Sequence, residues 1–404
     1  MPKRCGAGAD RPSVLMLCPE APWPMYGGGA LRTASLAHFF ATWADLHLVI
    51  FRQPDDAAAE PDTPARISWI DLPAHRRDLL SRAARNARRW AQGTPPLIDR
   101  FSGFSEQLRS CIAGSHYDLA VIEHFWCAAY VDVLRARCDR VWLDLHNVES
   151  EWHQTLARCA PAPARPALRS FARACLGRER ELLPRFDQVL VPSGDEARIC
   201  ENSIVYPNAL PLLPAPVRRE ENVIAFSGNL EYQPNIDAVA FFYGRIWPLL
   251  RERHADLRWR IVGKNPAAVA GLVRGDERVE FSGPVTDAIA ELARAQVCVA
   301  PVRAGSGTRL KILEAWAAGA PVVSTSFGAR GLGAAAGEEI LIADEAESFA
   351  DAVSELLHSR ERRIRVAAAG RRRYEEHFTW EAVWPRLASH FSEMMSNLGS
   401  LYTG

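Results

Sequence analysis

The chain has 404 residues, of which 48% are hydrophobic and 24% charged, a composition that excludes a globally disordered protein. Lys plus Arg and Asp plus Glu both number 48, so the formal net charge is zero, which excludes a generally basic nucleic-acid-binding protein. The nine cysteines form no Cys-x-x-Cys pair, so neither a disulfide framework nor a zinc site is expected. At about 100–200 residues per domain, this length predicts two or three domains.

The first half of the chain alternates short apolar runs with longer segments of helical spacing. Ser13–Cys18 reads as a buried strand, a turn rich in glycine and proline follows, and residues 30–41 read as a helix. Further strands are predicted at 46–51, 67–72, 118–122, 141–145, 188–192 and 203–206. This order of strand, turn, helix and strand predicts a parallel sheet with crossover helices.

Residues 210–216 read LPLLPAP and predict a linker, because proline fits neither a helix interior nor a central strand. The strand pattern then restarts at 223–226, 257–262, 279–281, 297–300, 321–325 and 340–342, with helices expected at 349–357 and 381–395. We therefore predict an α/β protein with two Rossmann-like domains, residues 1–209 and 217–380. Ligands of open parallel sheets bind beyond the carboxyl ends of the strands, so we expect the chemistry in a cleft between the two domains.

A glycine-rich loop that opens a helix gives the strongest local signal of a binding site. The loop consists of Gly305, Ser306, Gly307 and Thr308, and the helix is predicted over 309–318. Such a loop presents free N–H groups and the positive end of the helix dipole to an anion, typically a phosphate.

Three basic residues, Arg303, Arg309 and Lys311, lie around this loop and can neutralise a diphosphate. Lys311 and Glu314 are three apart and share one helix face, which places a carboxylate where a ribose diol would need an acceptor. The alternative is a structural helix start with a Lys311–Glu314 surface pair.

The run that follows resembles a known family signature. Residues 313–323 read LEAWAAGAPVV and residues 328–332 read GARGL. They resemble the donor-site pattern of the retaining glycosyltransferases of family 4 (glycosyl transferases group 1), which is Leu-Glu-Ala-Met-Ala-x-Gly-x-Pro-Val-Val and then Gly-x-x-Gly-Leu. The resemblance implies the GT-B fold, in which two Rossmann-like domains face each other across a cleft.

Further segments resemble the family in the same order along nearly the whole chain. Residues 26–36 resemble its N-terminal glycine loop, and 141–150 resemble the strand that delivers a histidine, here His146, to the cleft. Residues 225–237 resemble the first strand and loop of the second domain, and 281–287 resemble the loop that meets the nucleotide base. The last segment, 381–404, is then expected to pack as a helix back on the first domain.

The sequence departs from the family pattern at two places. Ser306 stands where many members have the first of two glutamates, so either the donor differs or activity is reduced. Gly228 is followed by Asn229 and not by the usual arginine, so we hypothesise that Arg303, Arg309 and Lys311 supply the phosphate-binding charge.

By this resemblance the protein is an enzyme that transfers a sugar, with retention of configuration, from a nucleotide-diphosphate sugar to a glycan or lipid-linked acceptor in cell-surface or exopolysaccharide synthesis. His146 and Glu314 are the expected catalytic residues. The donor-binding residues are predicted to be Gly228, Asn229, Arg303, Ser306, Gly307, Thr308, Arg309, Lys311 and Glu314. The acceptor and phosphate loop is predicted to comprise Gly27, Gly28, Gly29 and, beyond the strand at 118–122, Glu123. No cofactor and no metal are expected, because Asp-x-Asp, a common diphosphate–metal motif, does not occur.

Two alternatives stay open. A nucleotide-sugar epimerase of the same fold would consume donor without an acceptor, and a non-catalytic nucleotide-sugar-binding or assembly protein would bind donor without turnover.

Two arginine-rich stretches, 76–100 and 158–185, each carry a net charge of +5. They are either solvated helix faces or a surface that meets anionic lipid or an anionic lipid-linked acceptor. With neither a signal peptide nor a long apolar run, we expect a cytoplasmic protein, and the second interpretation adds peripheral contact with the inner face of the membrane.

Overall fold

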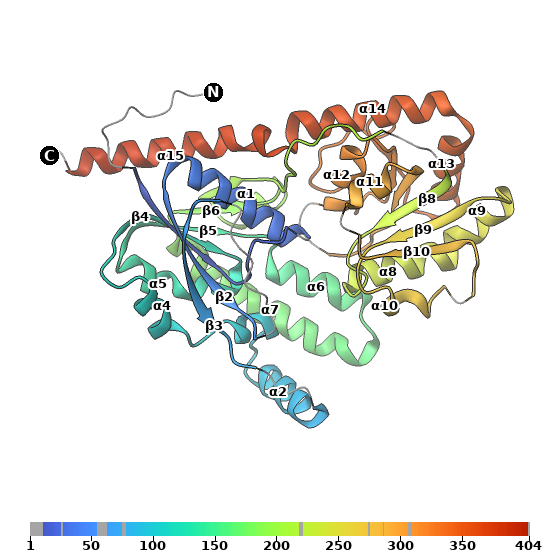
Figure 1. Ribbon diagram of the computed structural model, residues 1–404. Coiled ribbons are helices and arrows are strands. Elements are labelled where there is room, and N and C mark those ends of the chain that lie inside the picture. The colour runs from blue at the N-terminus through green and yellow to red at the C-terminus, as the bar shows by residue number, and fades with distance from the viewer. Residues whose placement is uncertain are drawn as a thin grey trace. The chain divides into compact units, whose positions relative to one another are not determined.

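The computed structural model describes residues 11–25, 27–54, 63–74, 78–217, 221–273, 275–285, 287–305 and 309–402 (Figure 1). The chain divides into two compact units. Unit 1 comprises residues 1–150, 170–206 and 384–404, and unit 2 comprises residues 151–169 and 207–383. Each unit contains one parallel sheet, so the predicted α/β fold with two Rossmann-like domains is confirmed.

The sheet of unit 1 has seven strands in the order β3-β2-β1-β4-β5-β6-β7. The strands are β1 (Ser13–Cys18), β2 (Asp45–Arg52), β3 (Arg66–Asp71), β4 (Tyr117–Glu123), β5 (Cys138–Asp144), β6 (Gln188–Val191) and β7 (Ser203–Val205). The order reverses at β1, which pairs with β2 on one side and β4 on the other. This reversal is the topological switch point at which open α/β sheets bind ligands.

Helices follow the strands of unit 1. They are α1 (Gly28–Trp43), α2 (Leu79–Ala91), α3 (Pro96–Arg100), α4 (Ser105–Cys111), η1 (Phe125–Tyr130), α5 (Val131–Arg135), η3 (Leu183–Arg185) and η4 (Glu196–Ile199). Two further helices, α6 (Glu149–Cys159) and α7 (Arg165–Leu182), contain the boundaries between the units, with the short η2 (Ala162–Ala164) between them.

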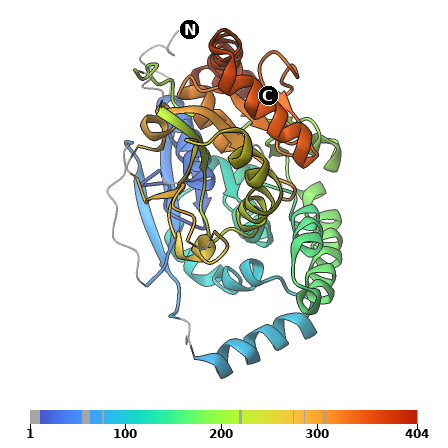
Figure 2. The ribbon, with the colours of Figure 1, turned by 90° about the vertical axis from the view of Figure 1, so that its right-hand side faces the viewer.

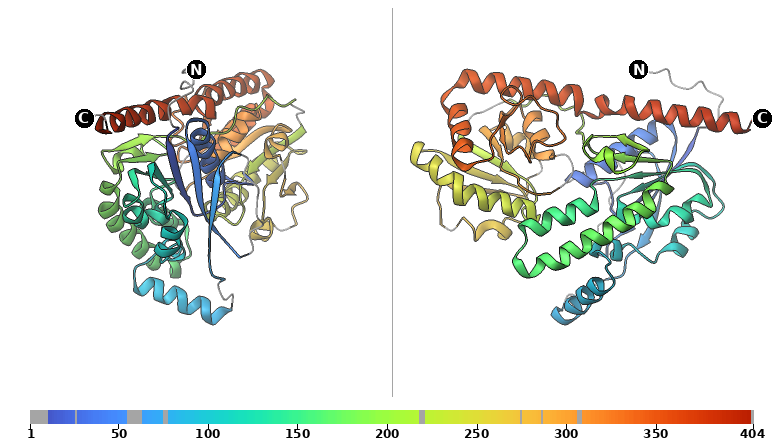
Figure 3. Two further views of the ribbon diagram at one scale, coloured as in Figure 1. Left: turned by 60° about the vertical axis from the view of Figure 1, so that its left-hand side comes forward. Right: turned by 180° about the vertical axis from the view of Figure 1, so that it is seen from behind.

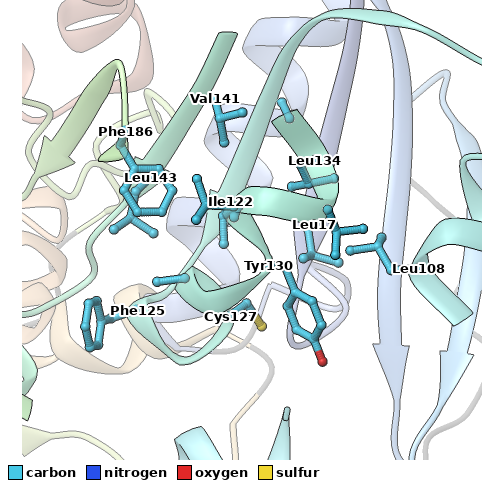
Figure 4. Packing of buried hydrophobic residues seen from close by; sticks show 14 of the residues in the cluster. Leu17, Leu108, Ile122, Phe125, Cys127, Tyr130, Leu134, Val141, Leu143 and Phe186 are labelled. Atoms are coloured by element: carbon cyan, nitrogen blue, oxygen red, sulfur yellow. The ribbon is translucent and has the colours of Figure 1, made fainter. Parts of the chain in front are cut away.

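One hydrophobic cluster of unit 1 lies on the face of the sheet that η1, α4 and α5 cover (Figure 4). Leu17, Ile122 and Leu143 project from β1, β4 and β5, and all three are fully buried. Cys127 and Tyr130 of η1 pack against them, and the Tyr130 hydroxyl donates a 2.5 Å hydrogen bond to the carbonyl of Phe101. Central parallel strands are covered on both faces, which is why these strands are continuous apolar runs.

The sheet of unit 2 has six strands in the order β10-β9-β8-β11-β12-β13, with its reversal at β8. The strands are β8 (Glu221–Ser227), β9 (Arg258–Val262), β10 (Val279–Gly283), β11 (Ala295–Ala300), β12 (Val322–Ser324) and β13 (Leu341–Ile342). The helices are α8 (Gln233–Phe241), the π-helical η5 (Phe242–Ile246), α9 (Trp247–Arg253), α10 (Ala267–Ala270), α11 (Ala288–Leu292), α12 (Leu310–Ala317), α13 (Ala346–His358), α14 (Arg360–His377) and α15 (Trp380–Tyr402). The last of these begins in unit 2 and continues in unit 1.

The compact units differ from the contiguous ranges 1–209 and 217–380 because two segments join the other unit. Residues 151–169 belong to unit 2, where Trp152 Nε1 donates a 3.0 Å hydrogen bond to the Tyr232 hydroxyl. Residues 384–404 belong to unit 1, where Trp384 Nε1 donates a 3.1 Å hydrogen bond to Ser35 Oγ. The ring of Phe391 packs edge-on against Phe40, with centroids 5.6 Å apart. Within the described ranges, no helix is apolar over a length that would cross a bilayer.

Candidate functional site

In unit 1, a buried charged cluster forms where β4 and β5 end side by side. Glu123 and Asp144 are the last residues of these strands and are paired in register. His146 follows two residues later, and its Nε2 lies 2.9 Å from Glu123 Oε2 and 3.2 Å from Asp144 Oδ2. All three side chains are buried. The carboxyl ends of two neighbouring strands therefore hold one imidazole between two carboxylates.

Arg32 of α1 neutralises Asp144. Its Nε lies 2.8 Å from Asp144 Oδ2, its Nη2 lies 2.5 Å from Oδ1, and its Nη1 donates to the carbonyl of Tyr206 at 2.5 Å. Burial alone would raise the pKa of Asp144, but the charge of Arg32 and the contacts with His146 together outweigh burial and lower this pKa to about 2. Asp144 is therefore ionised, and the guanidinium and carboxylate form a buried pair.

A 2.9 Å hydrogen bond joins Glu123 and His146. Burial, reinforced by the charge of Asp144, raises the pKa of Glu123. Burial would lower the pKa of His146, but its contacts with Asp144 and Glu123 raise it. Thr33 adds a 2.9 Å hydrogen bond from its hydroxyl to Glu123 Oε2. Both shifts favour the protonated forms of the two groups that meet in the hydrogen bond between His146 Nε2 and Glu123 Oε2.

The predicted glycine loop lies beside this cluster. Gly27 precedes α1 with φ +93°, a backbone conformation that favours glycine, and Gly28 begins the helix. A Cβ on Gly29 would lie 3.6 Å from His124 Nε2 and 3.7 Å from His146 Nδ1. The structure therefore brings Gly27–Gly29, Glu123 and His146 together at one edge of the sheet.

Aromatic stacking fixes the orientation of His146. Its ring stacks on that of His124 at a centroid distance of 3.5 Å, and His124 in turn stacks on Trp126 at 4.0 Å. Burial and the neighbouring charges of His146 and Arg32 hold the pKa of His124 well below its usual range. The His124 ring is therefore neutral, and the His146 ring stacks on it.

Glu123, Asp144 and His146 are also the group of described residues whose potential metal-ligand atoms lie within 4.8 Å of one another. The oxygens of Asp144 already accept hydrogen bonds from Arg32, and His146 Nε2 faces both carboxylates. A divalent cation would have to displace or repel a guanidinium here, so the arrangement suits an ion-pair network better than a metal.

In unit 2, the loop that contains the predicted donor residues Gly228 and Asn229 begins where β8 ends. Gly228 has φ +153°, and its N–H donates a 3.0 Å hydrogen bond to the carbonyl of Val262. A Cβ on Gly263, which has φ +151°, would lie only 1.9 Å from the carbonyl oxygen of Gly228. Two glycines are thus needed for the close backbone crossing that leads into the exposed Asn229.

Lys311 of α12 also reaches this loop. Helix α12 follows β11, the strand that pairs with β8. Its Nζ donates a 2.6 Å hydrogen bond to Asn235 Oδ1 and lies 4.2 Å from the centre of the Phe226 ring. A Cβ on Gly228 would lie 3.2 Å from the same Nζ. Burial, with the charge of Arg309, lowers the pKa of Lys311 to about 7 although Glu314 opposes the shift. The negative charge around Nζ is therefore too small to offset the cost of burying the ammonium.

Glu314 lies one helical turn beyond Lys311 on the same helix. It is half-buried, and its Oε2 accepts a 3.1 Å hydrogen bond from the hydroxyl of Ser227 at the end of β8. Burial raises its pKa. Lys311, Glu314 and Gly228 thus come together at the carboxyl end of β8, the strand at which the sheet order reverses.

The remaining predicted donor residues have different surroundings. Arg303 is half-exposed and pairs with Asp237, with 2.8 Å between Nη2 and Oδ1. Arg309 is buried at the start of α12, and its Nη1 would lie 3.2 Å from a Cβ on Gly305. Ser306, Gly307 and Thr308 lie outside the described residues.

The comparisons with known proteins bear first on unit 2. Residues 221–359 match the profile of the family described as "Glycosyl transferases group 1", which is 139 of the 404 residues. This match covers less than half of the chain, and we call the matched residues the group 1 domain. This group 1 domain runs from β8 into α13 and contains Gly228, Lys311 and Glu314.

One curated relative is a Klebsiella pneumoniae protein described as "Uncharacterized 44.6 kDa protein in cps region". The two are 24% identical over 186 residues, which is 43% of this chain. The match spans 47% of that relative, so less than half of its length is covered.

Solved structures resemble the chain over almost its full length. Sucrose-phosphate synthase from Thermosynechococcus elongatus has a TM-score of 0.72 at 18% identity, with 96% of this chain and 100% of that chain covered. HepE of Anabaena, in complex with UDP and glucose, has a TM-score of 0.64 at 14% identity, with 95% and 100% covered. A TarM variant of S. aureus, in complex with fondaparinux, α-GlcNAc-glycerol and UDP, has a TM-score of 0.66 at 11% identity, with 94% and 99% covered. At these identities the likeness establishes the fold.

Sequence reasoning missed four residues that hold these clusters together, namely Arg32, Asp144, Ser227 and Asn235. Two of them carried a signal: Arg32 lies within the apolar stripe of α1, and Asp144 ends an apolar strand. A charge at a position whose pattern requires burial implies a partner, because an unpaired buried charge is costly. Ser227 and Asn235 carried no such signal, since small polar residues are common in loops.

Proposed function

We propose that this chain is a glycosyltransferase that transfers a sugar from a nucleotide-diphosphate sugar to a glycan or lipid-linked acceptor with retention of configuration. The observation that carries the proposal is the group 1 domain, in which Lys311 and Glu314 meet the glycine turn at Gly228. UDP in the HepE and TarM complexes supports a nucleoside diphosphate as the ligand. The "cps region" in the name of the Klebsiella relative supports a role in polysaccharide synthesis, which we place on the cytoplasmic side as part of the proposal.

In this proposal, Lys311 replaces the basic residues that the family resemblance leads one to expect after Gly228. Its ammonium reaches the Gly228 turn from α12 and is fixed there by Asn235, whose Nδ2 donates a 2.7 Å hydrogen bond to the carbonyl of Asn229. Arg309 adds charge at the start of the same helix. Arg303 is engaged by Asp237 and has to exchange that partner to contact a phosphate. Lys311 is therefore the main phosphate ligand, and Glu314 accepts hydrogen bonds from hydroxyl groups of the donor.

In the reaction, the oxygen of the acceptor hydroxyl forms a bond to the anomeric carbon on the face from which the phosphate leaves. The bond between that carbon and the phosphate oxygen breaks, and its electron pair stays with the phosphate. The proton of the acceptor hydroxyl passes to the leaving phosphate, so no protein base and no metal are required. Lys311 stabilises the negative charge that develops on the phosphate.

Unit 1 contributes His146 in this proposal. Because its Nε2 faces Glu123 and Asp144, the imidazole is held in one orientation, and the other side of the ring lies toward Gly29. We assign His146 to binding a hydroxyl of the transferred sugar or of the acceptor, with Glu123 and Asp144 as positioning residues.

The test is a thermal-shift screen with UDP, GDP, ADP, dTDP and CMP and their sugar conjugates. A ligand at a hundredfold excess over its Kd should stabilise the protein by about 2.7 kcal/mol. Lys311→Met and Glu314→Gln should each weaken the affinity of the active nucleotide about 10- to 100-fold, whereas Arg365→Met, which removes an exposed positive charge from α14, should leave it unchanged.

Product analysis with the stabilising donor then separates the reaction classes. Transfer to an added glycan or lipid-linked acceptor, with the anomeric configuration retained in NMR spectra and in the presence of EDTA, supports the proposal. Conversion of the donor to its epimer without an acceptor would establish an epimerase instead. No shift with any nucleotide, from folded protein, would contradict a donor site in unit 2.

A further inference from the structure

Helix α2 of unit 1 stands away from the sheet of that unit, at the lower end of Figure 1 and again in Figure 2. It covers 13 residues, begins with Asp78 accepting a 2.8 Å hydrogen bond from the N–H of Ser81, and is followed by Gly93 with φ +58°. The helix is thus well defined at both ends although little of the protein covers it.

Its sequence is strictly divided between two faces. At 100° per residue, one arc contains only apolar side chains, and the opposite arc contains only polar ones. The apolar arc consists of Leu79, Leu80, Ala83, Ala84, Ala87, Trp90 and Ala91. The polar arc consists of Ser81, Arg82, Arg85, Asn86, Arg88 and Arg89. No carboxylate occurs within the helix, so its charge is entirely positive.

The apolar face is the exposed one. Leu79 is 81% exposed, Leu80 84% and Trp90 56%. The polar face, in contrast, is tied to the unit by Arg88 and Arg89, which pair with Asp99 at 2.8 and 2.7 Å. A surface helix of a globular protein normally buries its apolar stripe, so this inversion requires something else to cover the leucines and the tryptophan.

The second arginine-rich stretch lacks this feature. In α7, Phe171 and Cys175 are buried, and the one large apolar side chain that is exposed is Leu176, at 41%. Charge alone therefore does not distinguish the two stretches, whereas the exposed apolar face of α2 does. Figure 3 shows helix α2 from two further sides.

We propose that α2 lies in the interface of a membrane that contains anionic phospholipid, with Leu79, Leu80 and Trp90 below the headgroups. Leucine and tryptophan on one face and arginine on the other are the composition of helices that bind in the plane of a bilayer. Arg82 lies next to Asn86 near one edge of the apolar arc, from which a long cationic side chain reaches the phosphates while its stem stays among apolar groups. The charge complements the anionic surface, and each arginine contributes roughly fivefold to binding.

Flotation of the full-length protein with vesicles of phosphatidylcholine, with and without 30% phosphatidylglycerol, tests the proposal. The protein should float with the anionic vesicles, and binding should weaken at high salt. Leu79→Ser combined with Leu80→Ser and Trp90→Ser should lose at least tenfold in affinity. Arg82→Gln should lose about fivefold. Ile364→Ser, which removes a 53% exposed apolar side chain beside Arg363 and Arg365 on α14, should change nothing.

A second measurement keeps the result independent of folding. Brominated phosphatidylglycerol should quench part of the tryptophan fluorescence, and this part should disappear in Trp90→Phe, whose melting temperature should match that of the original protein because Trp90 is exposed. Equal binding of the triple variant and the original protein, or quenching that persists in Trp90→Phe, would overturn the proposal. Loss of a dimer in the triple variant, with no vesicle binding by either protein, would assign the face to a protein contact instead. None of these readouts depends on nucleotide binding.

Discussion

The two charged clusters of this protein differ in how their charges are balanced. In unit 1, Arg32 and His146 contact the carboxylates of Asp144 and Glu123 at distances of 2.5–3.2 Å. In unit 2, Lys311 donates to a neutral amide, lies near Arg309, and has a pKa lowered to about 7. The first cluster pairs each basic group with a carboxylate, whereas in the second Lys311 lies near a second cation, Arg309, and its ammonium donates to an amide. Charges that are paired within the protein keep their side chains in fixed positions. A cation without a paired carboxylate is instead stabilised when an anionic ligand binds.

The largest difference should appear when one charge of each cluster is removed from the protein without ligand. Asp144→Asn removes the carboxylate that pairs with the buried Arg32, so we expect unit 1 to lose about 3–5 kcal/mol of stability in urea unfolding. The matched control is Asp45→Asn, which removes the exposed partner of Arg11 and should cost less than about 1 kcal/mol. Equal effects of the two substitutions would show that the unit 1 cluster does not hold the fold.

Lys311→Met, in contrast, should not lower the stability of the protein without ligand at pH 7. The pKa of Lys311 is lowered on folding, from 10.5 to about 7, so between these values the unfolded chain binds more protons than the folded one. The stability of the original protein should therefore rise as pH increases from about 7 to 10. In Lys311→Met this rise should shrink, and at pH 7 the variant should be as stable as the original or more stable by about 1–2 kcal/mol. Marked destabilisation by this substitution would show that the two clusters are alike.

The smallest expected effect is a proton taken up on ligand binding. A nucleoside diphosphate beside Nζ favours the charged ammonium, so at pH 8 binding should take up part of a proton per site. Calorimetry of the stabilising nucleotide in Tris and HEPES, whose ionisation enthalpies differ, measures this number. Glu314→Gln should retain the uptake and Lys311→Met should lose it. Binding enthalpies that agree in the two buffers would place the titrating group elsewhere.

The sequence predicted the sheets well because burial on both faces leaves unmistakable apolar runs. Ser13–Cys18 is reproduced residue for residue, and the strands at 46–51 and 257–262 are within two residues of β2 and β9. The loop glycines and the pair Lys311–Glu314 were also visible, since a ligand or a close backbone crossing restricts which residues fit.

What the sequence could not show is the partner of each charge. Asn235 fixes Lys311, and Asp237 engages Arg303, through contacts that join residues about 70 positions apart. No local periodicity encodes such pairs. The exposed face of α2 was likewise hidden, because an amphipathic pattern predicts a buried stripe unless the surrounding structure is known.

The pairing of Phe391 with Phe40 has a consequence for biosynthesis. The ribosome makes Phe391 hundreds of residues after Phe40, so the aromatic surface of α1 has no cover from α15 while residues 207–383 of unit 2 are being synthesised. Unit 1 can form most of its sheet early, but its last contacts close only after the chain has passed through the other unit. Completion of unit 1 is thereby linked in time to the synthesis of unit 2.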